Sequence, residues 1–130
     1  MGKVGKFIHS AVGTKQGAAM GNTYDVNNRV DFNMGSASFR GRLSAIYFDG
    51  TIAGGATKLT IKVFSDATGT GRLIVPQTEC TLTTDISGSG GGAVVELEVD
   101  LVMSSGTFSM FGFTDAGTFE VTSAQITWEE

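Results

Sequence analysis

Within the segment from Ala93 to Met103, residues Val95 to Leu101 alternate apolar and acidic side chains with a period of two, and this pattern constrains the fold more than any other feature. The segment's apolar phase holds five residues and its acidic phase three, namely Val95, Leu97, Val99, Leu101 and Met103 against Glu96, Glu98 and Asp100. Successive side chains of a β-strand point to opposite faces, whereas a helix would scatter both kinds around its circumference. The segment is therefore predicted to be a strand with one buried face.

The composition extends this expectation to the whole chain. Gly accounts for 19 of 130 residues and Pro for one, while charged residues make up only 17%. The chain is long enough to bury a core as one domain without a metal or a disulfide. Short alternating segments separated by Gly-rich turns, with no helical pattern between them, are typical of antiparallel β folds. We expect an all-β, two-sheet antiparallel β-sandwich of jelly-roll type, with an open Greek-key barrel as the second choice.

Local signals mark where individual strands end. The alternation that begins at Ser38 is predicted to stop at the turn dipeptide Asp49-Gly50. A strand over Arg72–Val75 is predicted to stop at Pro76, which cannot donate a hydrogen bond inside a sheet. In Phe119–Trp128 the apolar phase slips, which predicts a β-bulge near Thr122-Ser123.

Two predictions concern packing. Lys58 and Lys62 share a two-residue phase, so we expect their strand to lie antiparallel beside the Ala93–Met103 strand, opposite its acids. The apolar phases of all strands are expected to meet in one core, made of Phe39, Leu43, Leu59, Ile61, Val63, Leu82, Val95, Leu97, Val99, Leu101, Phe108, Val121 and Ile126.

Residues 1–35 differ from residues 36–130. They lack a sustained period of two and carry irregularly spaced glycines, which indicates an extended N-terminal arm, or an irregular cover, on a β-sandwich domain, with one short strand at Arg29–Phe32. Residues 1–42 hold six Lys and Arg against two Asp, a net charge of +4, whereas residues 43–130 carry −8. Opposite charges of this kind would favour head-to-tail contact between copies. The candidate assembly contacts are basic or apolar residues of the arm: Lys3, Lys6, Phe7, Lys15 and Arg29.

Residues that could carry chemistry are sparse. His9 is the only histidine and Cys80 the only cysteine, so neither a catalytic pair nor a cysteine-based metal site is indicated. The alternating oxygens of Asp25 to Asp31 do not match the spacing of a calcium loop. We expect no catalytic residue, no metal and no cofactor. The acidic body and the absence of an apolar span indicate neither a nucleic-acid partner nor a membrane partner.

The C-terminal stretch from Phe113 to Trp128 resembles the last strands of small β-sandwich structural proteins of marine tailed phages, among them head-decoration (cement) proteins and fibre-knob modules. The stretch Leu59–Val75 fits the same pattern, because it combines a strand, a Gly/Thr loop and a second strand that ends at a proline. The resemblance covers roughly residues 40–128. It implies a virion component without catalysis and supplies no site residues.

We therefore expect a non-enzymatic viral structural protein, made in the host cytoplasm, that decorates or cements a phage capsid. Its expected partners are the major capsid protein or another virion protein and further copies of itself, with a trimer favoured. The alternative is a glycan- or receptor-binding knob of a fibre or tail. Such a knob would need an exposed aromatic side chain in a polar cleft, and Tyr24, Tyr47 and Trp128 are the candidates besides Phe.

Overall fold

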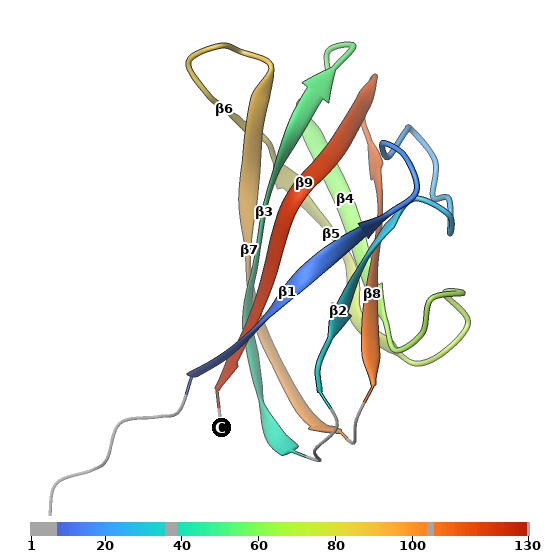
Figure 1. Ribbon diagram of the computed structural model, residues 1–130, viewed down its shortest axis with the longest axis vertical. Helices are drawn as coiled ribbons and strands as arrows, with labels where there is room; N and C mark the ends of the chain where they lie inside the picture. Colours follow the sequence, from blue (N-terminus) through green and yellow to red (C-terminus); the bar gives the residue numbers. More distant parts are fainter. Residues whose placement is uncertain (1–7, 36–38, 104–105, 130) are drawn as a thin grey trace, which may run out of the picture.

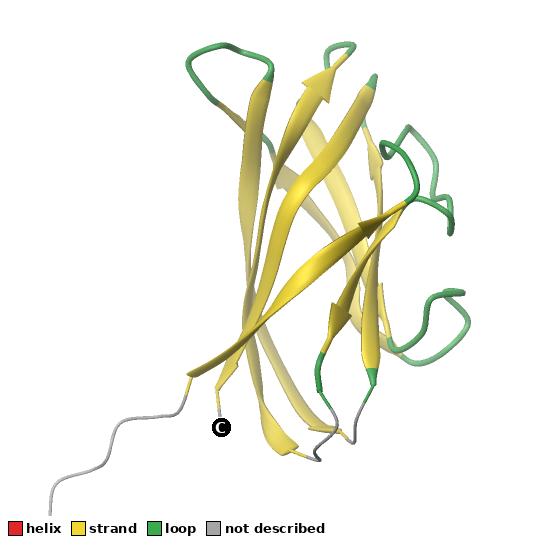
Figure 2. Cartoon of the chain, in the orientation of Figure 1, coloured by secondary structure: helices red, strands yellow, loops and turns green. Residues whose placement is uncertain are grey.

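The computed structural model describes residues 8–35, 39–103 and 106–129, and of Phe39, Arg40 and residues 101–103 it describes the backbone alone. These residues form nine β-strands and no helix (Figures 1 and 2). The strands are β1 (Ile8–Gln16), β2 (Arg29–Asn33), β3 (Phe39–Ala53), β4 (Lys58–Phe64), β5 (Leu73–Thr81), β6 (Thr83–Thr84), β7 (Gly90–Met103), β8 (Thr107–Thr114) and β9 (Thr118–Glu129). Every pairing between them is antiparallel, so the predicted all-β antiparallel class is confirmed.

The nine strands form one continuous sheet in the order β5-β4-β8-β2-β1-β9-β3-β7-β6. The sheet curls until β5 lies near β7, so it is nearly closed into a barrel (Figure 1). β1 joins the two halves, because its residues 8–12 pair with β9 and its residues 13–16 pair with β2. We call β5, β4, β8 and β2 the β8 half, and β9, β3, β7 and β6 the β3 half.

The prediction of an extended N-terminal arm is wrong for residues 8–16, which form β1, whereas the short strand predicted at Arg29–Phe32 is found as β2. β1 and β2 occupy the middle of the chain's own sheet instead of extending away from it. The inner face of β1 carries Ala11 and Gly13, and a Cβ on Gly13 would lie 2.5 Å from Val30 Cγ1 and 2.8 Å from Phe32 Cε1. Small residues are needed at this crowded crossing, and they remove the apolar alternation that would have revealed a strand. Residues 1–7 lie outside the described part.

The interior holds most of the predicted core. The predicted residues found buried are Leu43, Leu59, Ile61, Val63, Leu82, Val95, Phe108, Val121 and Ile126. Leu97 and Val99 are only partly buried but pack against that core. Phe39 and Leu101 are described by their backbone alone, so their predicted burial stays a prediction. The residue-by-residue prediction missed Phe32, Ile46 and Phe119, which are all fully enclosed.

Two register shifts shape β3 and β9. Asp49 pairs with Ser123 while Gly50 pairs with Val121, so Thr122 is the extra residue of a β-bulge, as predicted. A second shift, between Leu43 and Ala45, was not predicted. The expected turn at Asp49-Gly50 is wrong, because β3 continues through both residues to Ala53. Gly50 is needed inside the strand, since a Cβ there would collide with the carbonyl oxygen of Glu120.

The predicted neighbourhood of β4 and β7 is also wrong. β4 pairs with β5 and β8, whereas β7 pairs with β3 and β6. Lys58 Nζ instead lies 3.5 Å from Glu79 Oε1 of β5, and Lys62 Nζ lies 5.1 Å from the ring centre of Tyr24. Exposed charges contribute too little to choose strand neighbours against the demands of core packing. Pro76 does not end β5, and it is tolerated because β5 is an edge strand.

Candidate interaction surface

The outer face of the β8 half is covered by the chain's own loops. Phe111 points away from the core cluster, yet only 3% of it is exposed. The loop between β4 and β5 lies over it, so that a Cβ on Gly69 would fall 3.7 Å from Phe111 Cε2, and Phe64 packs edge-on with ring centres 5.9 Å apart. Phe113 is covered in the same way by Tyr24, whose ring centre is 4.8 Å away. This face therefore forms a second, smaller apolar layer.

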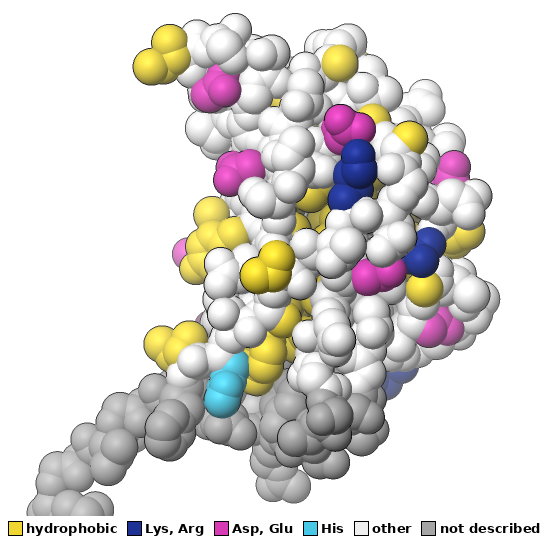
Figure 3. Space-filling view, viewed as in Figure 1, with side chains coloured by type: hydrophobic (Ala, Val, Ile, Leu, Met, Phe, Trp, Pro, Cys, Tyr) yellow, Lys and Arg dark blue, Asp and Glu magenta, His cyan; other side chains and the backbone are white. Residues whose placement is uncertain are grey.

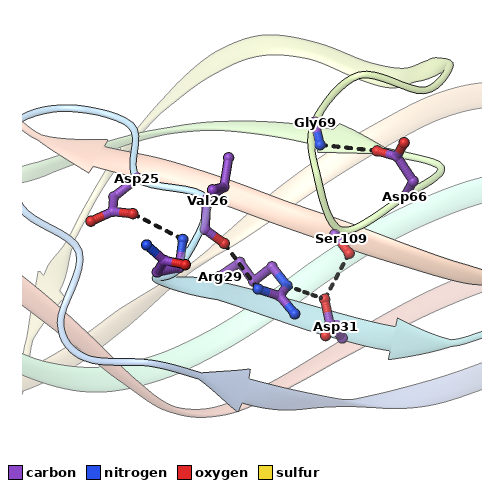
Figure 4. Close-up of polar contacts among 8 residues, drawn as sticks. Asp25, Val26, Arg29, Asp31, Asp66, Gly69 and Ser109 are labelled. Atoms are coloured by element: carbon purple, nitrogen blue, oxygen red, sulfur yellow. Dashed lines mark hydrogen bonds and ion pairs between the residues drawn. The ribbon is translucent and has the colours of Figure 1, made fainter.

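Polar contacts hold that layer in place (Figure 4). Arg29 Nε donates to Asp31 Oδ1 at 3.0 Å, and the wholly buried Ser109 donates to the same oxygen at 2.7 Å. Arg29 also donates to the carbonyl oxygen of Val26, which fixes the loop before β2. The other loop is closed by Asp66, whose carboxylate accepts from the amide of Gly69. Both covering loops are thus fastened to the strands beneath them or closed upon themselves.

Among the residues that the structure describes, no loop covers the outer face of the β3 half in this way. Four residues form a straight cross-strand row over β1, β9, β3 and β7: Val12, Gln125, Tyr47 and Val94. Val12 is 74% exposed, Tyr47 43% and Val94 55%. Figure 3 shows separate hydrophobic side chains over this part of the surface. We call these four residues the Tyr47 row.

Three hollows surround Tyr47. The largest, of about 470 Å³, extends along β7 past Glu96 and Leu97 to Glu98. A second, of about 420 Å³, lies toward Asp85 and the β6–β7 loop, and a third, of about 260 Å³, lies between Tyr47 and Val12. An amphipathic side chain flanked by hollows on several sides is typical of recognition surfaces.

Acidic residues border the Tyr47 row. Glu96, Glu98 and Asp100 are exposed along β7, and Arg42 Nε pairs with Asp100 Oδ1 at 2.9 Å. The hydrogen bond with Asp100, helped by the charges of Glu98 and Glu129, raises the pKa of Arg42. Within the described residues, neither Glu96 nor Glu98 has a cation within salt-bridge distance. The uncovered face therefore combines apolar side chains with excess negative charge.

Of the five predicted assembly residues the structure describes two, Lys15 and Arg29, and each of them is paired with an acid of its own chain. Lys15 Nζ forms an ion pair with Glu120 Oε2 at 2.9 Å, and Arg29 is bound to Asp31. Lys3, Lys6 and Phe7 lie outside the described residues. Tyr47 was predicted only as a candidate aromatic for a glycan site and was not grouped with Val12, Gln125 and Val94, because the Leu43–Ala45 shift that reverses the phase of β3 was not predicted. A second alternation from Ile46 through Phe48 to Ile52 was the signal that could have revealed it.

The remaining reactive residues have structural surroundings. The His9 ring stacks on Trp128 with centres 5.6 Å apart. Burial raises the pKa of the Cys80 thiol to about 11, and its Sγ donates to the Leu59 carbonyl, so the reactive thiolate is suppressed. Among residues 8–35, 39–103 and 106–129, no cluster of three His, Cys, Asp or Glu side chains could ligate a metal.

Comparison of the chain with protein-family models and with curated proteins finds no match. The described part of the chain also contains no helix capable of crossing a lipid bilayer.

Proposed function

We propose that this protein is a non-enzymatic structural component of a phage virion, which decorates or cements the capsid through the outer face of its β3 half. The observation that carries the proposal is the contrast between two outer faces of one sheet, one covered by its own loops and one bearing the exposed Tyr47 row. A row of exposed side chains across four strands, three of them apolar or aromatic, suits a protein–protein contact. The resemblance of Phe113–Trp128 to phage decoration proteins supplies the viral context.

The proposed partner is the major capsid protein or another virion protein, with homo-oligomerisation, as a trimer, on the capsid surface. We further propose that the two halves of the curled sheet serve as the two layers of a jelly-roll-like sandwich, as in the proteins that the chain resembles. A fold of this kind hosts many functions, so the assignment depends on the site and on the viral context.

The viral context is tested first by the genes beside the coding sequence, where structural genes of a tailed phage are expected. Neighbours that all encode cellular metabolism would contradict the proposal. The site is tested by adding the purified protein to particles of that phage that lack it and measuring the bound fraction after sedimentation.

A matched pair of variants makes the sedimentation test specific. Val94→Lys changes the Tyr47 row, whereas Val26→Lys changes a valine of similar exposure, 47%, on a loop of the β8 half. We expect Val94→Lys to abolish capsid binding and Val26→Lys to preserve it. Equal binding by both variants would exclude the Tyr47 row as the attachment surface.

The glycan- or receptor-binding knob remains a second candidate, favoured by the position of Tyr47 between three hollows. An aromatic ring can stack on the apolar face of a sugar while Asp49, Glu96 and Gln125 around it accept hydroxyl hydrogen bonds. Tyr24 and Trp128 fit this role less well, since Tyr24 packs on Phe113 and Trp128 is buried. A glycan array probed with the wild type and with Tyr47→Ala tests it: binding lost in the variant would support the knob, and no binding by the wild type would remove it.

A further inference from the structure

One edge of β7 has almost no strand beside it. Along its length β7 pairs with β3, from Thr51↔Gly90 to Phe39↔Met103. On the other side, within the described residues, only Gly91 and Gly92 pair, with the two-residue strand β6. β5 lies near β7 but shares no register with it (Figure 1). The backbone from Ala93 onward therefore presents an open edge, which is a template for another strand.

The side chains at this edge differ between its two faces. Leu97 and Val99 belong to the inner face, pack against the core and are only partly buried. Glu96, Glu98 and Asp100 point outward and are exposed. A further strand would complete the burial of Leu97 and Val99 and would set its own outward residues beside the carboxylates.

Within the described residues no competing core packing fixes the neighbour of this edge, so the charges can favour one kind of added strand over another. If the β7 edges of two copies paired about a two-fold axis near Leu97 or Glu98, carboxylates would stand opposite carboxylates. Like charges directly opposite destabilise a pair of strands. The acidic row therefore disfavours self-association along this edge and favours a strand with cations on its outward face.

We propose that the open edge of β7 binds, by β-strand addition, an extended segment of a different polypeptide in which basic and apolar residues alternate. Its apolar residues cover Leu97 and Val99, and its basic residues pair with Glu96 and Glu98. Main-chain hydrogen bonds supply affinity, and the two alternating faces supply specificity. The inference depends on the proposed function only for the source of the strand, a virion protein.

The test uses the full-length protein and a blocked heptapeptide of alternating lysine and valine, followed by NMR. Extended, this peptide spans about 20 Å, close to the length of Ala93–Val99. We expect backbone shift changes and slowed amide exchange to concentrate on β7. A control peptide with every amide N-methylated keeps the charges but cannot donate main-chain hydrogen bonds. Equal binding by the control, or shift changes centred on Val12 and Tyr47, would overturn the proposal.

Charge reversal on β7 provides a second test of strand addition. In the double variant Glu96→Lys and Glu98→Lys we expect affinity for the lysine–valine peptide to fall about tenfold, since two cross-strand pairs are reversed. The same variant should bind a glutamate–valine peptide instead. Asp49→Lys changes an acid on the same face one strand away from the edge, and it should alter affinity less than about twofold. Equal weakening by Asp49→Lys would indicate non-specific attraction and would overturn strand addition.

If charge reversal unfolds the protein, Glu96→Gln with Glu98→Gln replaces it, with a smaller loss of peptide affinity expected. A wild-type homodimer joined through β7 in sedimentation experiments would also overturn the choice of partner. Because no virion is used, failure of peptide binding is distinguishable from failure of capsid attachment.

Discussion

The two halves of the sheet both carry aromatic residues on their outer faces, but those of one half are covered and that of the other is exposed. Phe111 on β8 is buried under the β4–β5 loop, whereas Tyr47 on β3 remains exposed. The strands themselves do not account for the difference. The loops of residues 17–28 and 65–72 both fold over the β8 half, and no described loop covers the Tyr47 row. Where a chain places its long connections therefore decides which face of a curled sheet is available to partners.

The largest effect that this contrast predicts is on stability at Phe111. Phe111→Ala should lower the free energy of unfolding by about 3–5 kcal/mol, because it removes a buried ring and leaves a cavity under the loop. Tyr47→Ala should lower it by about 1 kcal/mol or less, a cost set mainly by strand propensity. Urea denaturation of both variants measures the difference. Equal losses would show that the two outer faces are not energetically distinct.

A smaller difference in stability is expected between variants of Arg29 and Lys15, which the sequence suggested as assembly contacts. Arg29→Ala should lower the free energy of unfolding by about 1–2 kcal/mol, because Asp31 loses a charged hydrogen bond in a partly enclosed site. Lys15→Ala breaks an exposed pair with Glu120 and should cost under about 1 kcal/mol. Thermal melts of both proteins provide the test, and a larger loss for Lys15→Ala would contradict the assignment of Arg29 to the covering layer.

A loss of stability in acid is predicted at the turn between β8 and β9, where Asp115 is hydrogen-bonded to Thr57 and to Lys58 at the start of β4. Asp115, in the turn between β8 and β9, accepts hydrogen bonds from the Thr57 hydroxyl and amide and from the Lys58 amide, which hold its pKa far below the ordinary value. A lowered folded-state pKa means that this stabilisation is complete above about pH 4, the unfolded value, and is lost as the pH falls further.

Asp115→Asn should therefore lower the melting temperature at neutral pH and flatten its fall between about pH 4 and pH 2. Melting curves recorded by circular dichroism at several pH values measure both. Asp49→Asn serves as the control, because its side chain has no such hydrogen bonds among the described contacts. An unchanged acid slope in Asp115→Asn would exclude this carboxylate as the source.

The smallest stability effect is expected on the Tyr47 row itself. Val12→Thr and Val94→Thr keep the branched shape at exposed positions and should change the free energy of unfolding by less than about 0.5 kcal/mol. Both should weaken attachment to the partner, because they remove apolar contact area. A stability loss above about 1 kcal/mol for either variant would mean that the face is already covered within the monomer.

The sequence predicted the fold class and most of the core because these depend on alternation. The phase slip at Thr122-Ser123 even located the β9 bulge, since two exposed residues in succession can be read directly. β1 could not be found in this way. Its buried side has Ala11 and Gly13 where it crosses Val30 and Phe32, while its larger residues Ile8 and Val12 face outward.

The candidate surface was harder to predict than the core. Its composition is ordinary, and it is marked by the exposure of Val12, Tyr47 and Val94. The exposure of Tyr47 depends on the bulge at Ser44 and on the loops that fold over the other half. Long-range backbone contacts decide both. The same limitation explains the failure at Asp49-Gly50: the glycine is required there because β9 approaches too closely for any side chain, and it does not mark a turn.

The position of β1 has a consequence for how the chain acquires its structure during synthesis. Ile8 pairs with Glu129, so one of the first described residues to leave the ribosome must wait for one of the last. Contacts of such long sequence separation raise the contact order and slow folding. Until β9 emerges, β1 and β2 have no complete sheet to join. We therefore expect the sheet to close only after β9 has been synthesised, with the nascent chain vulnerable to aggregation until then.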